Sequence, residues 1–378
     1  MKRIIAFALL AFTAFAVKAS VPSVNEFPGT DPRITYVGRT LSGPDGVTFD
    51  WSASGVRIRF SGTVLSLRVS DTDKDYYNLW IDHEPDAEAD KVLAVAGKDT
   101  TIVLFDAREG LSAKAAKKVK PAEHTLWLNK RTEGEQGKTT VHAVLTDGTL
   151  LQAPGVKSRI IEVVGDSNTC GYGSENSVAS DPFTKETENC NKSYASILGR
   201  YFGADVYLIA HSGMGIARNY RDKLMGYCMP DRYLNVFDDG FDKRDDTPLW
   251  DPANAPKPDI TIVYLAANDF SVQRQPTVKA FTDGYLRLLK EIKEFYGPKH
   301  PILCAASRPE YYDYVRGAVE RCGLENVTMF GVGAMYSGSD ERGASAHPNY
   351  QAHRKLAHCF IPYVATLTGW GLQDAEVR

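Results

Sequence analysis

Residues 164–173 read VGDSNTCGYG and follow the apolar run IIEVV at residues 160–164. A buried strand that ends in a tight turn is how an α/β sheet presents a nucleophile at the carboxyl edge of its strands, where ligands bind. Ser167 stands in that turn, directly after Gly165 and Asp166. The stretch therefore predicts an α/β fold and makes Ser167 the candidate nucleophile of a serine hydrolase.

The composition is that of an ordinary globular protein. The chain has 378 residues, of which 43% are apolar and 24% are charged, and its formal net charge is −3. This length is enough for two hydrophobic cores. The balanced charge argues against the basic surface that binding to nucleic acid or to an anionic membrane requires. We expect a small or neutral substrate and no nucleic-acid partner, and the sequence leaves the oligomeric state open.

The first 19 residues have the pattern of a secretory signal peptide. Lys2 and Arg3 precede an apolar run at residues 4–17, and small or compact residues surround a cleavage position near Ala19. A membrane anchor is the alternative, but the run is shorter than the roughly 20 residues that a spanning helix needs. We therefore expect an exported protein, periplasmic or secreted, without a membrane span.

The first half of the remaining chain has a strand pattern. Short runs that alternate apolar and polar residues are separated by Gly, Pro, Asp and Ser clusters, which form turns. These runs are residues 56–60, 64–69, 77–82, 100–105, 124–128 and 139–145. The pattern predicts an all-β sandwich of the jelly-roll type.

The second half alternates strands and helices. After the sequence QAPG at residues 152–155, strand-like runs occur at residues 160–164, 204–210, 260–265, 301–305 and 327–332, and helix-like runs at residues 193–201, 277–295, 310–321 and 350–367. This alternation predicts a parallel sheet covered by helices. We expect a signal peptide at residues 1–19, a β-sandwich domain at residues 20–155 and a catalytic domain at residues 156–378.

A serine hydroxyl needs an adjacent base and hydrogen-bond donors for the oxyanion. His347 is the candidate base, because it lies in a polar loop and Pro348 favours the start of a helix directly after it. The alternative is that His347 is an ordinary surface residue, as a solitary histidine before a helix usually is. Gly213 and Asn268 each follow a strand and offer a backbone N–H and a side-chain amide. Alone they are ambiguous, because glycines after strands are common and an Asn-Asp turn can satisfy its own backbone.

The order of these motifs resembles the SGNH hydrolase superfamily: Gly-Asp-Ser, Ser-Gly-x-Gly, Asn-Asp and His-Pro-Asn, each at a strand end or a helix start. The resemblance implies a flavodoxin-like sheet with Ser167 as nucleophile and His347 as base. It also implies an oxyanion hole formed by the N–H groups of Ser167 and Gly213 and by the amide of Asn268. Gly215 replaces Gly213 if the register of the loop slips by two residues.

The resemblance can be narrowed to family 2 of the carbohydrate esterases. It rests on GDSNTCGYG at residues 165–173, KRTE at residues 130–133, SGMGIARN at residues 212–219 and the preceding sandwich. It implies that the protein removes O-acetyl groups from plant polysaccharides such as xylan and glucomannan. The reaction would pass through an acetyl-enzyme on Ser167.

Two features depart from the pattern of these families. Asn168 stands where an apolar residue is usual, and Ala344 and Ser345 occupy the positions where the superfamily commonly has an aspartate before the histidine. Resemblance to family members that lack this acid implies a Ser-His dyad in which a backbone carbonyl orients the imidazole. Asp340 and Glu341 are the alternative acids if their loop folds back.

Aromatic side chains that stack on sugars are expected near the site. Phe270, Tyr311 and Tyr312 follow strands on the side where a substrate cleft would lie. Packing in the core is the alternative for them. We expect Asp166 and Asp269 to be structural and to fix their loops by side-chain to backbone bonds.

All six cysteines lie in the second half of the chain. In an exported protein they can form disulfides, and Cys170 with Cys190 is the first candidate pair because the two bracket one loop. No CxxC motif and no His/Cys cluster at metal-binding spacing is present in the sequence. We expect no metal and no other cofactor.

Two alternative functions remain open. A lipase, arylesterase or thioesterase of the SGNH type would need a longer apolar acyl pocket. A glycan-binding protein that has kept the fold and lost the chemistry is favoured only by the missing triad acid. The sequence does not identify the polysaccharide, nor does it separate hydrolysis from transfer of acetyl groups to another sugar.

Overall fold

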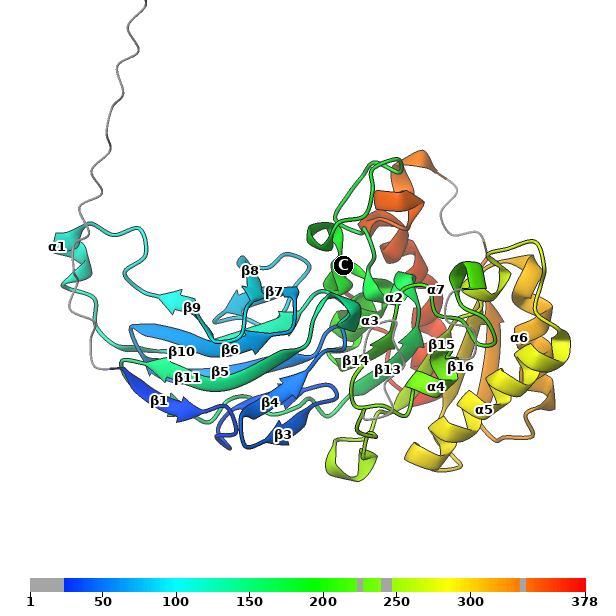
Figure 1. Ribbon diagram of the computed structural model, residues 1–378, viewed down its shortest axis with the longest axis horizontal. Coiled ribbons are helices and arrows are strands. Elements are labelled where there is room, and N and C mark those ends of the chain that lie inside the picture. The colour runs from blue at the N-terminus through cyan, green and yellow to red at the C-terminus, as the bar shows by residue number, and fades with distance from the viewer. Residues whose placement is uncertain (1–23, 223–226, 239–246, 334–337) are drawn as a thin grey trace, which may run out of the picture.

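The computed structural model describes residues 24–222, 227–238, 247–333 and 338–378. The predicted signal peptide at residues 1–19 lies outside these ranges. Within them, no helix combines the length and the apolar character needed to cross a bilayer. The described chain forms a β-sandwich and an α/β domain that lie beside each other along the long axis of the molecule (Figure 1).

The sandwich consists of two antiparallel six-stranded sheets. One contains β1 (Asn25–Pro28), β3 (Leu41–Gly43), β4 (Gly46–Phe49), β6 (Val64–Asp71), β9 (Thr100–Asp106) and β11 (Thr139–Thr146). The other contains β2 (Thr35–Val37), β5 (Gly55–Gly62), β7 (Lys74–Ile81), β8 (Lys91–Ala96), β10 (Ala122–Lys130) and β12 (Thr149–Leu151). The predicted sandwich is confirmed, and the structure adds β1 to β4, β8 and β12.

Alternation along the strands builds the core of the sandwich. In β5, Val56, Ile58 and Phe60 are buried between the sheets, whereas Arg59 is exposed. Successive side chains of a strand point to opposite faces, so this period of two places one apolar face inward. The core is therefore closed by the residues whose alternation indicated the strands.

The C-terminal part contains a parallel five-stranded sheet in the order β14-β13-β15-β16-β17. Its strands are β13 (Ile160–Gly165), β14 (Asp205–Ala210), β15 (Ile260–Tyr264), β16 (Ile302–Ala306) and β17 (Val327–Gly331). The order 2-1-3-4-5 is that of flavodoxin-like sheets, in which ligands bind at the carboxyl ends of the strands where the order reverses. The predicted parallel sheet is confirmed.

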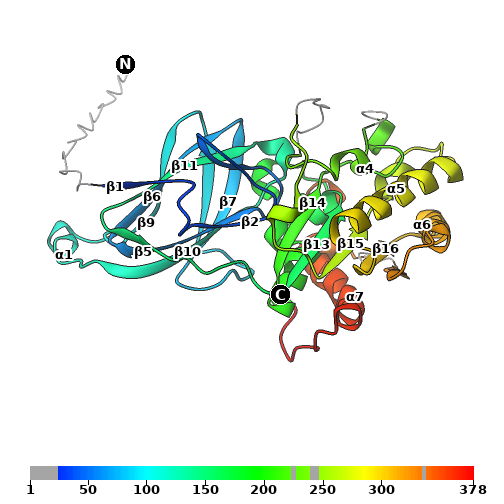
Figure 2. The same cartoon turned by 90° about the horizontal axis from the view of Figure 1, so that it is seen from below.

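Helices cover both faces of this sheet (Figure 2). In the C-terminal part the chain forms α2 (Ser167–Cys170), α3 (Tyr194–Phe202), α4 (Met229–Arg232), α5 (Val278–Tyr296), α6 (Pro309–Arg321) and α7 (Tyr350–Thr368). The short helix α1 (Ala113–Ala116) lies between β9 and β10 of the sandwich. Ile161 and Val163 of β13 pack with α3 and α7, whereas Val164 packs with α5. Both faces of β13 are buried, which explains why its sequence, apart from the buried Glu162, is apolar without alternation.

Eight short 3-10 helices complete the described elements. They are η1 (Gly134–Gln136), η2 (Lys185–Thr187), η3 (Cys190–Lys192), η4 (Tyr220–Asp222), η5 (Pro252–Asn254), η6 (Ala267–Phe270), η7 (Ser339–Glu341) and η8 (Ala344–Ala346). Among these, η6 contains Asn268 and Phe270, and η8 directly precedes His347.

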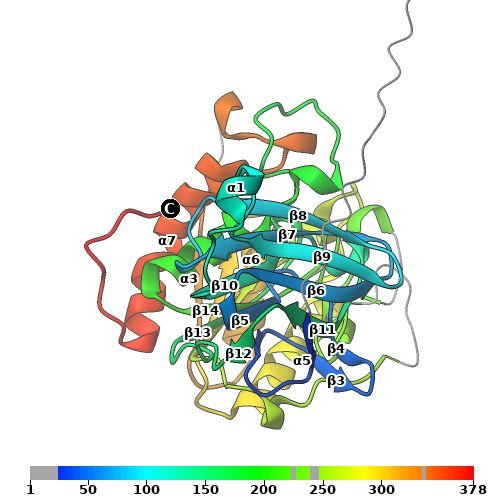
Figure 3. The same cartoon turned by 90° about the vertical axis from the view of Figure 1, so that its left-hand side faces the viewer.

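The two domains are joined by polar contacts. Figure 3 looks onto the sandwich with the α/β domain behind it. Arg57 of β5 forms a buried ion pair with Asp205 at the start of β14. On the other side of the interface, Trp51 Nε1 donates to the Val236 carbonyl at 3.0 Å. The sandwich thus contacts both the amino-terminal edge of the parallel sheet and the segment before β15.

The structure contradicts the predicted disulfide between Cys170 and Cys190. Both thiols are free and buried. Cys170 Sγ donates to Glu133 Oε2 at 3.4 Å, and Cys190 Sγ donates to the Lys130 carbonyl at 3.2 Å. The two residues bracket one loop in sequence, but each thiol is directed to its own acceptor at the domain interface. All six cysteines are free in the structure.

Candidate active site

Ser167 is the first residue of α2 and is separated from the end of β13 by Asp166 alone. Asp166 caps this short helix, because its Oδ1 accepts the backbone N–H of Asn168 at 3.0 Å. Gly165 is required by a close approach, since a Cβ at this position would lie 2.0 Å from Thr169 Oγ1. The turn therefore needs Gly and Asp directly before the serine, and it places Ser167 at the carboxyl edge of the sheet.

The structure brings His347 to Ser167. His347 Nε2 lies 3.0 Å from Ser167 Oγ. The other ring nitrogen, Nδ1, lies 3.2 Å from the Ser345 carbonyl oxygen. A carbonyl accepts an N–H, so this contact selects the tautomer in which Nδ1 carries the proton and Nε2 is free to accept the serine proton. The geometry is that of a Ser-His pair oriented by the backbone.

Neither alternative acid bonds to this histidine. Glu341 forms an ion pair with Lys355. Asp340 is exposed, and its carbonyl accepts from the Asn349 side chain at 2.7 Å. Across the described parts of the chain, no carboxylate is hydrogen-bonded to His347.

The loop before His347 is held in a strained conformation. Ser345 and Ala346 have φ values of 52° and 58°, in the left-handed region that non-glycine residues rarely adopt. The N–H of Ser345 donates to the Asp181 carbonyl at 2.7 Å, and that of Ala346 donates to the Ala179 carbonyl at 3.0 Å. These two bonds fix the backbone whose carbonyl orients the imidazole.

Aromatic packing also holds the imidazole. The ring of Tyr172 lies 4.4 Å from that of His347, centroid to centroid, and stacks on Phe183 at 3.8 Å. Tyr172 follows Ser167 in sequence, so the same turn that presents the candidate nucleophile also packs against His347. Sequence reasoning missed these contacts, and no signal in the residues 172–183 pointed to them.

The candidate oxyanion donors lie after neighbouring strands. The N–H of His211 donates to the Gly165 carbonyl at 3.4 Å, so the loop after β14 starts beside the nucleophile turn. Gly213 has a φ of 82°. In the described part of the chain, the N–H groups of Ser167 and Gly213 donate to no other acceptor. Both are therefore available to an oxyanion.

Gly215 is less suited to that role. Its N–H already donates to Asn219 Oδ1 at 3.1 Å. Asp269 accepts three backbone N–H groups of the same loop, those of Ile216, Ala217 and Arg218, at 2.8, 2.7 and 3.0 Å. The loop register places Gly213, rather than Gly215, with a free N–H, and Asp269 fixes the loop as expected of a structural residue.

Asn268 lies in η6, at the end of β15. Its Nδ2 donates to the Met214 carbonyl at 2.8 Å and, over a longer 3.3 Å, to Asp166 Oδ2. Burial raises the pKa of Asp166 to about 6, so its carboxylate is mostly ionised at neutral pH. The Asn268 amide is thus held between the loop of Met214 and the turn of Asp166. Breaking the longer bond, to Asp166, would free one N–H of the amide to donate to an oxyanion.

A cavity of about 400 Å³ brings these residues together. Ser167, His347 and Asn268 line it, whereas Gly213 does not. Its wall also contains residues that the sequence did not single out, namely Tyr220, Ser271, Arg308, Glu310 and Arg342. Arg308 and Glu310 follow β16, so their position after a strand was the signal that could have found them.

The predicted aromatic residues divide into two groups. Phe270 and Tyr311 line the cavity and pack on each other, with ring centroids 5.5 Å apart. Tyr311 is mostly buried, and its hydroxyl lies 2.6 Å from Ser307 Oγ. Tyr312 does not line the cavity, because the next position of α6 points elsewhere and its ring lies against Gly331 of β17. The cavity lends no support to a sugar contact at Tyr312, which stays a prediction.

A larger cavity of about 670 Å³ lies between the domains. It is lined by Arg57, Trp127 and Asp205, at the end of β14 opposite to Gly213. It contains neither Ser167 nor His347. Size alone therefore does not mark the candidate site.

The protonation of His347 gives a pH dependence. Burial lowers the pKa of His347, against the opposing effects of the Ser345 carbonyl and the Glu133 carboxylate. A histidine base must be neutral to act. We therefore expect kcat/KM for an ester substrate to fall as the pH falls through the pKa of His347, which lies below the ordinary histidine value of about 6.5. The imidazole signal of His347, assigned in the NMR spectrum with His347→Gln, should titrate with the same midpoint. An acid limb above pH 7 would contradict the assignment.

Two family profiles match the chain in succession. The profile of the carbohydrate esterase 2 N-terminal domain matches residues 36–154, and that of the GDSL-like lipases and acylhydrolases matches residues 161–360. The first covers the sandwich strands from β2 to β12. The second covers the strands and loops that carry Ser167, Asn268 and His347.

Individual proteins show the same similarity. Cellulase/esterase CelE of Acetivibrio thermocellus is 29% identical over 350 residues, which are 90% of this chain but only 40% of the length of CelE. The acetylxylan esterase / glucomannan deacetylase of Cellvibrio japonicus is 24% identical over 353 residues, 92% of each protein. A solved family two carbohydrate esterase from Clostridium thermocellum, in complex with cellohexaose, is 28% identical with a TM-score of 0.77 and covers 89% of this chain and 100% of that one. With the N-terminal profile before a GDSL-like profile that spans more than half of its residues, the chain belongs to family 2 of the carbohydrate esterases.

Proposed function

We propose that the chain is an exported serine esterase that removes O-acetyl groups from polysaccharides of the xylan and glucomannan class. The observation that carries the proposal is the 3.0 Å contact between His347 Nε2 and Ser167 Oγ. The contact lies at the wall of a cavity that also presents Asn268. A nucleophile, a base and an oxyanion donor at one cavity are the parts that acyl transfer from an ester requires.

The first half of the reaction acetylates Ser167. His347 Nε2 takes the hydroxyl proton as Ser167 Oγ bonds to the acetyl carbonyl carbon. The oxyanion accepts the N–H groups of Ser167 and Gly213 and the amide of Asn268. The tetrahedral intermediate then collapses, the bond between the carbonyl carbon and the sugar oxygen breaks, and His347 returns its proton to that oxygen.

The second half releases acetate. A water molecule gives a proton to His347 and adds to the acetyl carbon of the acetyl-enzyme. Collapse of this second intermediate breaks the bond to Ser167 Oγ, which regains its proton from His347. The Ser345 carbonyl orients the imidazole throughout, but a neutral acceptor stabilises an imidazolium less than a carboxylate does.

The substrate class is supported by relatives and by the cavity wall. The similar protein of Cellvibrio japonicus is an acetylxylan esterase / glucomannan deacetylase, and the similar structure from Clostridium thermocellum is a complex with cellohexaose. Arg308, Glu310 and Arg342 give the cavity polar walls that suit a sugar better than a long alkyl chain. Export is inferred from the signal-peptide pattern of residues 1–19.

The acyl chain of the substrate tests this assignment. With p-nitrophenyl esters, kcat/KM for acetate should exceed that for octanoate by at least about tenfold, because polar walls leave added methylenes without an apolar pocket. Ser167→Ala provides the background rate for each ester. A preference for the longer ester would instead favour a lipase-type activity.

A further inference from the structure

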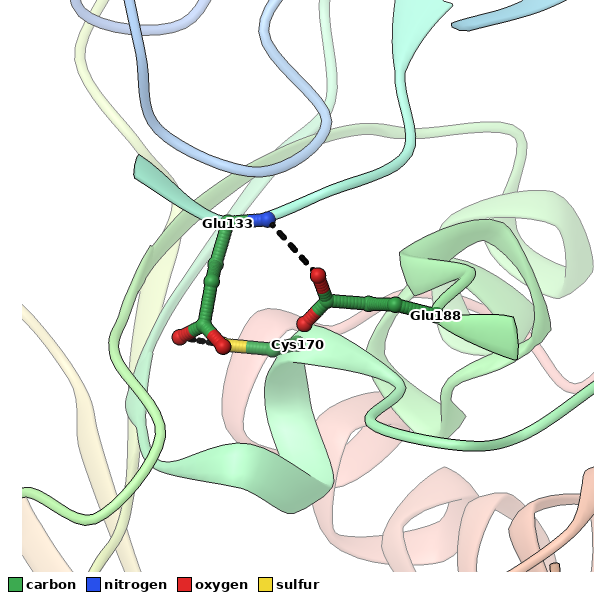
Figure 4. Close-up of side chains that lie close together, drawn as sticks. All are labelled: Glu133, Cys170 and Glu188. Atoms are coloured by element: carbon green, nitrogen blue, oxygen red, sulfur yellow. Dashed lines mark hydrogen bonds between the residues drawn. The ribbon is translucent and has the colours of Figure 1, made fainter. Parts of the chain in front are cut away.

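Glu133 comes from the sandwich side of the molecule but reaches the loops of the candidate site. It follows β10 in the chain and precedes η1. Its side chain is 0% exposed. Figure 4 shows its carboxylate against the thiol of Cys170, with Glu188 beside them. No step of the proposed reaction uses these three side chains.

One carboxylate oxygen of Glu133 joins two segments of the site. Glu133 Oε2 accepts the backbone N–H of Ser212 at 2.6 Å and the thiol of Cys170 at 3.4 Å. Ser212 directly precedes Gly213, and Cys170 ends the helix that begins with Ser167. The oxyanion loop and the nucleophile helix are therefore bonded to the same atom.

Glu133 is itself held firmly. Its N–H donates to Glu188 Oε2 at 3.2 Å, and its carbonyl accepts from Lys130 Nζ at 2.9 Å. Lys130 in turn bonds to Asp75 of β7 at 2.6 Å. Burial, reinforced by the Glu133 charge, raises the pKa of Glu188 and of Cys170 well above their usual ranges, so the Cys170 thiol keeps its proton at neutral pH. The Glu133 carboxylate thus extends from a backbone segment that is hydrogen-bonded on both sides, and the Cys170 thiol acts as a donor to it.

A second contact ties the same loop to the sandwich. His211 Nδ1 lies 2.6 Å from Asp238 Oδ2, and the N–H of Asp238 donates to Asp50 Oδ2 at 2.8 Å. Asp50 belongs to the sandwich side, directly after β4. His211, the residue before Ser212, is consequently anchored to the sandwich through its side chain, whereas Gly213 contributes its carbonyl, which accepts the N–H of Tyr220 at 2.7 Å.

We propose that Glu133 is a positioning residue for the esterase reaction, which holds the N–H of Ser212 so that the following N–H, that of Gly213, points into the oxyanion hole. Glycine has wide backbone freedom, so without an anchor the Gly213 N–H would sample several directions. An oxyanion hole contributes to the rate only when its donors are oriented before the reaction. The sandwich domain thereby completes the active site. The inference rests on the proposed function, because it assigns Glu133 a part in that reaction.

The same residues could in principle hold a metal ion. One ligand atom each of Glu133, Cys170 and Glu188 lie within 4.8 Å of one another, and so do those of Glu133, Glu135 and His211. Glu133 Oε2, however, already accepts two hydrogen bonds, one of them from the backbone. Hydrogen bonds thus account for the contacts of Glu133 Oε2. A bound metal ion is one of the outcomes that the experiments below distinguish.

Three variants test the positioning role with p-nitrophenyl acetate. Glu133→Ala should lower kcat by about 10- to 100-fold with little change in KM, since a misplaced donor weakens only the transition state. Glu133→Gln keeps an oxygen that can accept the Ser212 N–H and should retain most of kcat. Arg57→Ala removes a buried contact between the domains at the other end of β14 and is the matched control. Its kcat should stay near the wild-type value even where its melting temperature falls.

The pH dependence of kcat/KM is a second readout, and a purely structural role of Glu133 would leave it unchanged. The groups facing Glu133 are Cys170, Glu188, Glu135, His211 and Lys130. The Glu133 carboxylate raises the pKa of His347. Loss of that charge in either Glu133→Ala or Glu133→Gln should lower this pKa, and the acid limb of kcat/KM should move to lower pH. In Arg57→Ala the limb should not move.

Phosphonylation separates failure of this inference from failure of the proposed function. A fluorophosphonate forms a bond from phosphorus to Ser167 Oγ, fluoride leaves, His347 takes the hydroxyl proton, and the phosphoryl oxygen occupies the oxyanion hole. This needs no sugar ester, so its rate, followed by intact mass, reports on the loop even if acetyl esters are not turned over. We expect Glu133→Ala to react at least about tenfold more slowly than the wild type.

Several results would overturn the positioning role. They are an unchanged phosphonylation rate in Glu133→Ala, an equal loss in Glu133→Gln, an equal loss in Arg57→Ala, or activity that is lost on chelation and restored by Zn²⁺. If Glu133→Ala does not fold, Glu133→Asp replaces it. The shorter side chain keeps the charge but falls one methylene short of Ser212, so it should react slowly with its acid limb unmoved. A wild-type rate in Glu133→Asp would refute the inference.

Discussion

Replacement of Ser167 by alanine should lower kcat for p-nitrophenyl acetate by at least about 10⁴-fold. Ser167 Oγ is the atom that forms the acetyl-enzyme, and the variant has no other hydroxyl at 3.0 Å from His347 Nε2. The oxyanion donors remain, so a small residual rate above that of water is expected. Initial rates at saturating ester, corrected for spontaneous hydrolysis, measure the effect.

The fold of this variant should not change. Within the described residues, the Ser167 side chain makes no hydrogen bond other than its contact with His347. The thermal unfolding transition of Ser167→Ala should therefore match that of the wild type, which is the control for the kinetic measurement. Retention of a substantial part of kcat in a folded variant would show that the ester is cleaved without this nucleophile.

Replacement of His347 by alanine should lower kcat by about 10²- to 10⁴-fold. The loss follows from removal of the group that takes and returns the serine proton. Asp340→Ala is the matched variant, because Asp340 is the acid that could have completed a triad. Its side chain is exposed and makes no bond to His347, so the change should stay within about twofold.

The order of the two effects decides between a dyad and a triad. A larger loss in Asp340→Ala than in His347→Ala would overturn the assignment of the Ser345 carbonyl as the orienting group. Glu341 needs no alanine variant of its own, because its carboxylate forms an ion pair with Lys355.

Sequence reasoning selected residues that the structure brings together because each stands at a recognisable place. Ser167 follows a strand, Asn268 follows another, and His347 precedes a helix. Parallel strands bring their carboxyl ends to one edge, so these positions predict proximity without any knowledge of distance. The structure brings all three to one cavity, and it places the imidazole at hydrogen-bonding distance from the serine.

The support of His347 could not be predicted in the same way. It depends on left-handed conformations at Ser345 and Ala346, which are not residues that favour them, and on carbonyls of Ala179 and Asp181 in a distant loop. Such bonds join backbone atoms, which carry no mark in the sequence. Only the folded chain shows which carbonyl meets which N–H.

The disulfide prediction failed and the sugar contact of Tyr312 gained no support from the cavity, both for local geometric reasons. Cys170 and Cys190 are close in sequence, but each thiol has its own acceptor at the interface with the sandwich. Tyr312 is next to Tyr311, but adjacent residues of a helix do not share a face. Short strands such as β3 were missed because three residues do not establish an alternation.

The release of acetate from acetylated polysaccharides tests the central claim most directly. The wild-type chain would be incubated with acetylated xylan, acetylated glucomannan and an acetylated glycan of a different backbone, with Ser167→Ala in parallel. We expect acetate from xylan or glucomannan at rates that depend on Ser167. Firm binding of these polymers by the wild type without any acetate release would contradict the claim and identify a binding protein.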